Sequence, residues 1–171
     1  METEQRYEFD DLTHISAVAV GVPGQRTFFL IVANGREWVR VWLEKEVLEA
    51  LTVAIERLTE ALALEKLYEP DAGAEEGPAV GQAPAGLPAY EVEVEQISLG
   101  YDEGKAILDL VVHPSGPKSL GWSELYCHLG LGMLKGFGVQ AAAVCAAGRP
   151  RCPLCGLPMD DPDKHVCPES N

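Results

Sequence analysis

The stretch Arg36-Glu37-Trp38-Val39-Arg40-Val41-Trp42-Leu43 alternates between two kinds of side chain, and a helical pattern follows it directly. One face of the predicted strand carries Val39, Val41 and Leu43, and the opposite face carries the two tryptophans and Arg40. In residues 44–67, large apolar residues recur every three or four positions, which predicts a helix with one apolar stripe. We expect the valine face of the strand to pack on that stripe. The stripe consists of Leu48, Leu51, Ile55, Leu58 and Leu62.

Two further strands are predicted upstream. Residues 15–21 alternate, whereas the predicted strand at residues 26–33 is apolar on both faces from Phe28 to Val32 and suits a central position. Pro23-Gly24 favours a type II turn between them. Asn34-Gly35 predicts a type I′ hairpin turn into the third strand. The first half, residues 1–68, is therefore predicted to run strand-strand-strand-helix.

The second half, residues 89–149, repeats this order. Three strands with one helix make a minimal sheet, so we expect both halves to share one core. The predicted fold class is α+β, with two strand-strand-strand-helix halves forming one core plus a C-terminal zinc ribbon. The predicted elements are strands at residues 90–101, 105–113 and 120–129, a turn at residues 114–117, and a helix at residues 131–147.

Two stretches break the regular pattern. Residues 69–88 are dense in Pro, Gly, Ala and acidic residues, which predicts a mobile linker on the surface. Gly130, Gly132 and Gly136 stand between a strand and a helix, as in a dinucleotide-binding fingerprint, but with the spacing Gly-x-Gly-x-x-x-Gly. We interpret these glycines as close helix-to-sheet packing. Their helix penalty leaves open whether the whole stretch is helical.

The C-terminal tail holds a spaced set of metal ligands. Cys152 and Cys155 flank a turn, and His165 and Cys167 lie one residue apart, so each pair can face one ion. A Cys₃His set is a standard zinc site, and residues 150–171 are predicted to form a zinc ribbon. Because all four positions are filled by protein, the zinc is expected to be structural.

Two alternatives compete with zinc in this tail. A redox Cys-x-x-Cys motif is expected after a strand in a thioredoxin-like unit, but this pair follows a long helix. A disulfide is disfavoured by the odd number of cysteines, which is 5. The N-terminus lacks an apolar segment typical of a secretory signal, and no apolar run reaches membrane-spanning length. We therefore expect a cytoplasmic protein, where thiols stay reduced.

The charge balance restricts the partners. Lys and Arg number 13 against 27 Asp and Glu, which gives a net charge of −14. Such a surface repels phosphate backbones, so binding of nucleic acid is not expected. Arg149, Arg151 and Lys164 lie near the predicted ribbon and serve either as a local basic patch or as partial compensation for the acidic field.

Arg26 and Lys45 are the candidate ligand-binding residues. Arg26 follows a Pro-Gly turn, and arginine suits bidentate contact with carboxylate or phosphate. Lys45 opens the first helix. The alternative for both is an ordinary surface ion pair. Cys127 and Cys145 read as buried small residues, and neither His14 nor His113 has a visible partner in the sequence.

Three segments carry a resemblance to a known family. They are residues 21–30, residues 43–46, and residues 146–156 together with His165-Val166-Cys167-Pro168. On these segments the chain resembles an uncharacterised bacterial family, domain of unknown function 3090. The resemblance supports the architecture and implies no activity. The glycines between 130 and 138 depart from the family's expected pattern.

The preferred hypothesis is a zinc-containing cytoplasmic binding or adaptor protein with a protein partner. The alternative is an enzyme or enzyme subunit with a pocket between the halves near Arg26 and Lys45. A deep pocket at those residues would favour the enzyme, and an exposed apolar patch on the ribbon would favour the adaptor. The sequence specifies no catalytic residue and no oligomeric state. The patch would comprise Leu154, Leu157, Pro158 and Met159.

Overall fold

The fold has seven strands and two helices in the described part of the chain. A computed structural model describes residues 5–10, 12–22, 24–64, 84–105, 107–115, 122–148, 151–157, 159 and 163–170. The elements are β1 (Arg6–Phe9), β2 (His14–Val20), β3 (Thr27–Ala33), β4 (Trp38–Leu43), α1 (Lys45–Leu64), β5 (Tyr90–Asp102), β6 (Ile107–Ser115), β7 (Glu124–Leu129) and α2 (Leu131–Ala146).

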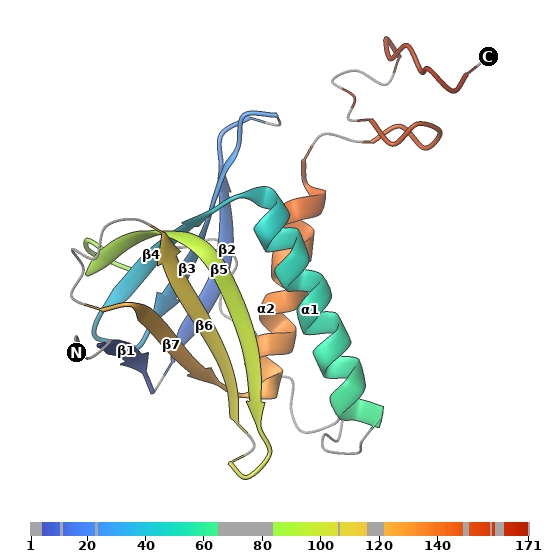
Figure 1. Cartoon of the computed structure of the whole chain (residues 1–171). Coiled ribbons are helices and arrows are strands. Elements are labelled where there is room, and N and C mark those ends of the chain that lie inside the picture. Colours follow the sequence, from blue (N-terminus) through green and yellow to red (C-terminus); the bar gives the residue numbers. More distant parts are fainter. Residues whose placement is uncertain are drawn as a thin grey trace.

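These strands form one sheet in the order β1-β7-β6-β5-β4-β3-β2, and the sheet is strongly curled (Figure 1). The two halves of the chain meet where β4 and β5 run parallel, with Val41 opposite Val92. Parallel neighbours require a long crossover connection, and α1 lies in the segment that makes it. The predicted single core, with both halves sharing a sheet, is confirmed.

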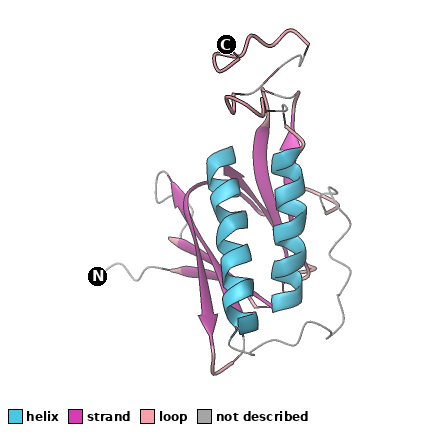
Figure 2. Ribbon diagram, turned by 90° about the vertical axis from the view of Figure 1, so that its right-hand side faces the viewer, coloured by secondary structure: helices cyan, strands magenta, loops and turns pink. Residues whose placement is uncertain are grey.

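Both helices lie side by side across one face of the sheet (Figure 2). α2, which belongs to the second half, packs on β2 of the first half, whereas α1 packs on β5 and β3. Gln140 of α2 reinforces this crossing, since its side chain bonds both the N–H and the carbonyl of Ala17 in β2 at 2.8 and 2.7 Å. Each half therefore depends on the other for its cover.

The predicted faces of the third strand are correct. Val39, Val41 and Leu43 lie in the core with the α1 stripe, and the α2 residues Leu134 and Phe137 join the same cluster. The opposite face forms a second, smaller cluster around β3 and β4, where the guanidinium of Arg40 lies over three rings and bonds Glu91 at 2.6 Å. The rings are those of Phe29, Trp38 and Trp42.

β1 was not predicted. It pairs in parallel with β7, and the Tyr7 hydroxyl donates to the Glu37 carboxylate near the start of β4. The Tyr7 ring also stacks on Trp122, with centroids 5.6 Å apart. A four-residue strand with mostly polar side chains has too little periodicity to be recognised, and its partners are distant in sequence.

Three predicted boundaries were wrong. β6 runs through Pro114 to Ser115 instead of turning at residue 114; Pro114 stands opposite Val94 beside a bulge, where a strand tolerates a missing N–H. The last strand begins at Glu124, since Trp122 and Ser123 precede it without strand structure, and residues 120 and 121 of the predicted strand lie outside the described residues. The β3–β4 loop holds four residues, and Asn34 N–H donates to Glu37 O at 3.2 Å, so the turn lies one residue beyond Asn34-Gly35.

The predicted linker, residues 69–88, lies outside the described residues as far as residue 83. Residues 84–88 contain bends and no helix or strand. The mobility of the linker therefore stays a prediction.

The glycine-rich stretch is helical from Leu131 onward. Gly138 faces α1, because a Cβ built on it would lie 2.7 Å from Cγ2 of Ile55. The predicted helix-to-sheet contact is at this position a helix-to-helix contact. A Cβ at Gly132, by contrast, would meet nothing within 4 Å.

These two glycines form a matched pair for a stability test. Gly132→Ala should stabilise the protein by about 0.5–1 kcal/mol, because alanine restricts the unfolded chain and fits the helix. Gly138→Ala should destabilise it by about 1–3 kcal/mol, because the added methyl meets Ile55 in a packed core. Urea unfolding measures both changes. Equal stabilisation by both substitutions would show that the helices do not approach closely at Gly138.

Candidate metal centre

The start of the tail is a tight chain reversal. The Cys152 N–H donates to Leu157 O, and the Gly156 N–H donates to Cys152 O, both at 2.9 Å. Gly156 has a φ of 72°, in the left-handed region that glycine adopts without strain. The turn therefore needs glycine, and it brings the side chains of Cys152 and Cys155 to the same side.

The reversal assembles all four predicted metal ligands. One ligating atom from each of Cys152, Cys155, His165 and Cys167 lies within 4.8 Å of the others. The Cys152 and Cys167 sulfurs are 3.7 Å apart, and Cys155 Sγ lies 3.4 Å from His165 Nε2. A disulfide sulfur pair is about 2 Å apart, so these thiols are free. The arrangement is consistent with a metal site.

The electrostatics of the cluster favour thiolate at Cys152. The backbone groups of Cys155 and Leu154 bond its sulfur and lower the pKa of Cys152 to about 6. Burial raises the pKa of Cys167, and the neighbouring sulfurs of Cys152 and Cys155 add to that effect. Thiolate is the form that binds metals, and a cation held among the sulfurs would relieve the repulsion between thiolates.

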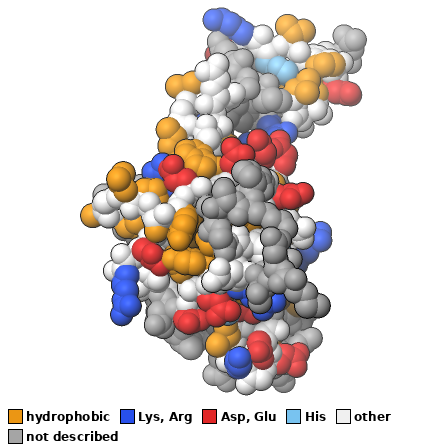
Figure 3. Space-filling model, turned by 60° about the vertical axis from the view of Figure 1, so that its left-hand side comes forward, with side chains coloured by type: hydrophobic (Ala, Val, Ile, Leu, Met, Phe, Trp, Pro, Cys, Tyr) orange, Lys and Arg blue, Asp and Glu red, His pale blue; other side chains and the backbone are white. Residues whose placement is uncertain are grey.

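The tail extends beyond the start of α1 and the end of α2, away from the body (Figure 1). Within it, Cys152 and Met159 are buried, whereas Leu154, Leu157 and Val166 are 66, 49 and 89% exposed. Figure 3 shows hydrophobic side chains at the surface of this extension. Of the four residues in the predicted patch, Leu154 and Leu157 are exposed and Met159 is buried. Pro158 lies outside the described residues.

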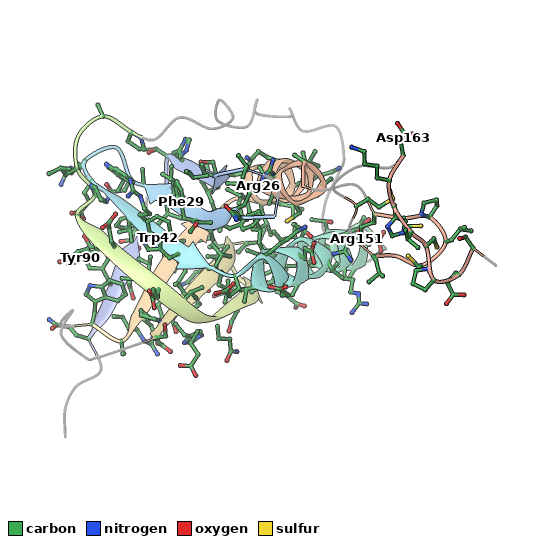
Figure 4. The ribbon with its side chains drawn as sticks, turned by 90° about the horizontal axis from the view of Figure 1, so that it is seen from above. Arg26, Phe29, Trp42, Tyr90, Arg151 and Asp163 are labelled. Carbon is green, nitrogen blue, oxygen red and sulfur yellow. The ribbon has the colours of Figure 1, made fainter. Side chains whose placement is uncertain are left out.

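Arg26 and Lys45 line one cavity of about 480 Å³. The cavity lies where the β2–β3 turn, the β4–α1 junction and the end of α2 meet, and Gly148 and Arg151 complete it. Figure 4 shows Arg26 on the body and Arg151 where the tail begins. Sequence reasoning missed Arg151 as a lining residue. All three segments that carry the family resemblance contribute lining residues to this cavity. That shared resemblance is the sequence signal that could have grouped Arg151 with Arg26 and Lys45.

The two cations differ in their partners. Lys45 Nζ lies 3.6 Å from Glu49 Oε1, which is a partly exposed ion pair within α1. Arg26 pairs with no carboxylate among the described residues, and its Nε is buried without a hydrogen-bond partner there.

The family comparison agrees with the three segments. The model of the family described as "Protein of unknown function (DUF3090)" matches residues 7–167. The chain belongs to the DUF3090 family. No curated protein and no solved structure matches it. The DUF3090 match extends over both halves of the sheet and the Cys/His tail, so the resemblance is confirmed, and the family's description names no activity.

The other cysteines of this DUF3090 protein lie apart from the cluster. Cys127 is fully buried in β7, and burial raises its pKa to about 12. Burial also raises the pKa of Cys145, which is partly exposed near the end of α2. His14 and His113, which have no visible partner in the sequence, have partners in the structure. His14 Nε2 lies 2.8 Å from Ser16 Oγ, and His113 Nε2 lies 3.1 Å from Ser98 Oγ.

A second group of polar residues was not foreseen. His128 Nδ1 lies 2.6 Å from Asp109 Oδ1, and His128, Glu8 and Asp10 offer ligand atoms within 4.8 Å of one another. Its members come from β1, the residue after it, β6 and β7, so only the sheet order brings them together.

No helix in the described part is long and apolar enough to cross a membrane.

The geometry predicts one metal ion per chain. Protein purified without added metal should carry close to one equivalent, and Cys155→Ser should lower that content sharply because it removes a ligand. Cys145→Ser, which changes a thiol outside the cluster, is the control and should leave the content unchanged. Elemental analysis by mass spectrometry measures all three. Full metal content in Cys155→Ser would refute the ligand assignment.

Proposed function

We propose that this DUF3090 member is a cytoplasmic adaptor protein, in which a structural zinc ion orders the tail for binding to another protein. The observation that carries the proposal is the coincidence, on one short segment, of a four-ligand metal cluster and exposed apolar side chains.

The distances within the cluster support zinc. Tetrahedral zinc with Zn–S bonds of about 2.3 Å places two sulfurs about 3.8 Å apart, and a sulfur and an imidazole nitrogen about 3.6 Å apart. The corresponding separations are 3.7 Å for Cys152–Cys167 and 3.4 Å for Cys155–His165. Soft thiolates with one imidazole favour zinc over magnesium or calcium, which prefer oxygen ligands.

The ligand count supports a structural role. A catalytic zinc keeps one position for water or substrate, whereas Cys152, Cys155, His165 and Cys167 would fill all four positions of a tetrahedron. So short a segment has almost no apolar core; among its described residues, Cys152 and Met159 are the buried apolar ones. Metal binding would then supply the folding free energy of the tail.

The exposed side chains support a protein partner. Leu154, Leu157 and Val166 would lose water on contact with an apolar pocket, which is the usual source of binding energy at an interface. The net charge of −14 favours a partner whose surface around that pocket is basic and disfavours nucleic acid. The five free thiols suit the reducing cytoplasm.

A second candidate function is an enzyme or enzyme subunit, and the cavity shared by Arg26 and Lys45 favours it. The cavity is lined mainly by the first half of the chain, with Gly148 and Arg151 contributed from the end of α2 and the tail. The lining thus includes residues of both halves and of the tail, which supports the location near Arg26 and Lys45.

The adaptor proposal predicts that partner capture depends on the tail. Leu154→Ser combined with Val166→Ser should remove a protein that the wild type retains in cross-linked pull-downs from the native host. Val53→Ser, which changes a valine exposed by 44% on α1, is the control and should retain that protein. Quantitative mass spectrometry compares the three captures, and zinc content verifies that the double variant keeps its metal.

Two outcomes would oppose the proposal. Equal capture by the wild type and the double variant would mean that the tail does not bind the partner. Loss of the same protein in Val53→Ser would mean that capture reflects general surface hydrophobicity.

A further inference from the structure

The cavity lined by Arg26 and Lys45 brings three cationic side chains together on an acidic protein, beside the carboxylates of Glu44 and Glu46. Of the 13 Lys and Arg residues in the chain, three line this one space, namely Arg26, Lys45 and Arg151. They come from three separate segments, so the fold and not local composition brings them together. Arg26 and Arg151 are labelled in Figure 4.

Arg26 has unused hydrogen-bonding capacity. Its Nε is buried without a partner in the described part of the chain, and no carboxylate there pairs with its guanidinium. A buried donor of this kind costs free energy unless something accepts its hydrogen bond. An anion in the cavity would supply the acceptor.

The other two cations are held at the wall. Lys45 Nζ lies 3.6 Å from Glu49 Oε1, and it is close to Gly148, where a Cβ would approach within 3.3 Å of it. Arg151 makes one long bond of 3.4 Å from Nη1 to Gly156 O, which leaves the rest of its guanidinium fork for other acceptors. Arg151 directly precedes the turn of residues 152–157 that carries Cys152 and Cys155, here called the metal turn, so the position of Arg151 depends on this turn.

The chemistry of the lining selects a ligand class. A carboxylate has two oxygens and is satisfied by one arginine fork, whereas a phosphate monoester presents three outer oxygens to cations on several sides. The amino end of α1 also faces the cavity, and its dipole favours an anion. Glu44 and Glu46 on the same wall would accept hydrogen bonds from ligand hydroxyl groups.

We propose that this cavity binds the phosphate group of a hydroxylated phosphate monoester, such as a sugar phosphate, and that the metal turn completes the site by positioning Arg151. A volume of about 480 Å³ accommodates a molecule of that size. This site goes beyond the adaptor role, because it uses a different surface and does not require a protein partner. Only the positioning of Arg151 rests on the proposed metal.

Isothermal titration of the metal-loaded protein with ribose 5-phosphate tests the ligand class. Ribose 5-phosphate should bind at least about 10-fold more tightly than gluconate, a hydroxylated carboxylate, because its phosphate oxygens contact more than one cationic side chain. Inorganic phosphate should bind more weakly than the ester because it lacks the hydroxyl groups. Absence of binding by ribose 5-phosphate at millimolar concentration, or equal binding of gluconate, would overturn the proposal.

Charge-matched variants test the residues. Arg26→Ala and Arg151→Ala should each weaken ribose 5-phosphate binding by about 10-fold or more, since each removes charge-assisted hydrogen bonds. Arg57→Ala removes the same charge from an exposed position on α1 and should leave the affinity within about twofold. Equal weakening by Arg57→Ala would reduce the effect to net charge and overturn the site. Arg151 lies outside the core, so its variant remains informative if Arg26→Ala does not fold.

Metal removal separates this inference from the metal assignment. Dialysis against a chelator, followed by removal of the chelator, should weaken ribose 5-phosphate binding about as much as Arg151→Ala does. Unchanged affinity after verified metal loss would overturn the link between the turn and the cavity. A cavity that binds the ester in the wild type but not in Arg26→Ala would stand even if the tail held no metal.

Discussion

The parallel pairing of β4 with β5 is the constraint on which the rest of the structure depends. It joins two three-strand units into one sheet, and it requires the chain to leave β4, pass through α1 and return alongside it. With the sheet continuous, α2 reaches β2 and both helices cover one face. Neither half would bury its apolar face alone, so the core forms as a unit.

This architecture also determines where the functional features lie. The β2–β3 turn, the start of α1 and the end of α2 meet at one end of the fold, and the tail continues from there. The cation-lined cavity and the Cys/His cluster are therefore neighbours, with Arg151 between them. The geometry of the Cys/His cluster depends little on the core. Its ligands lie within 19 residues of the C-terminus, and a local turn closed by Gly156 positions them.

Much of this could be predicted from the sequence because the relevant patterns are local. The alternation of Val39, Val41 and Leu43 and the α1 stripe identified the core faces, and the ligand spacing identified the cluster. What failed depends on distant partners. β1 is visible only through its pairing with β7, Pro114 is tolerated only beside the bulge at Val94, and Arg151 joins Arg26 only after the fold closes.

The central claim is that the core folds as one unit and that the metal orders only the tail. Hydrogen exchange followed by mass spectrometry, with and without a chelator, tests it most directly. The account predicts that metal removal abolishes protection in residues 151–170 and leaves β4, β5 and both helices protected, because local opening of an appendage leaves the core intact. Loss of protection in β5, β6 and β7 together with the tail would contradict it, since the metal would then be stabilising the sheet.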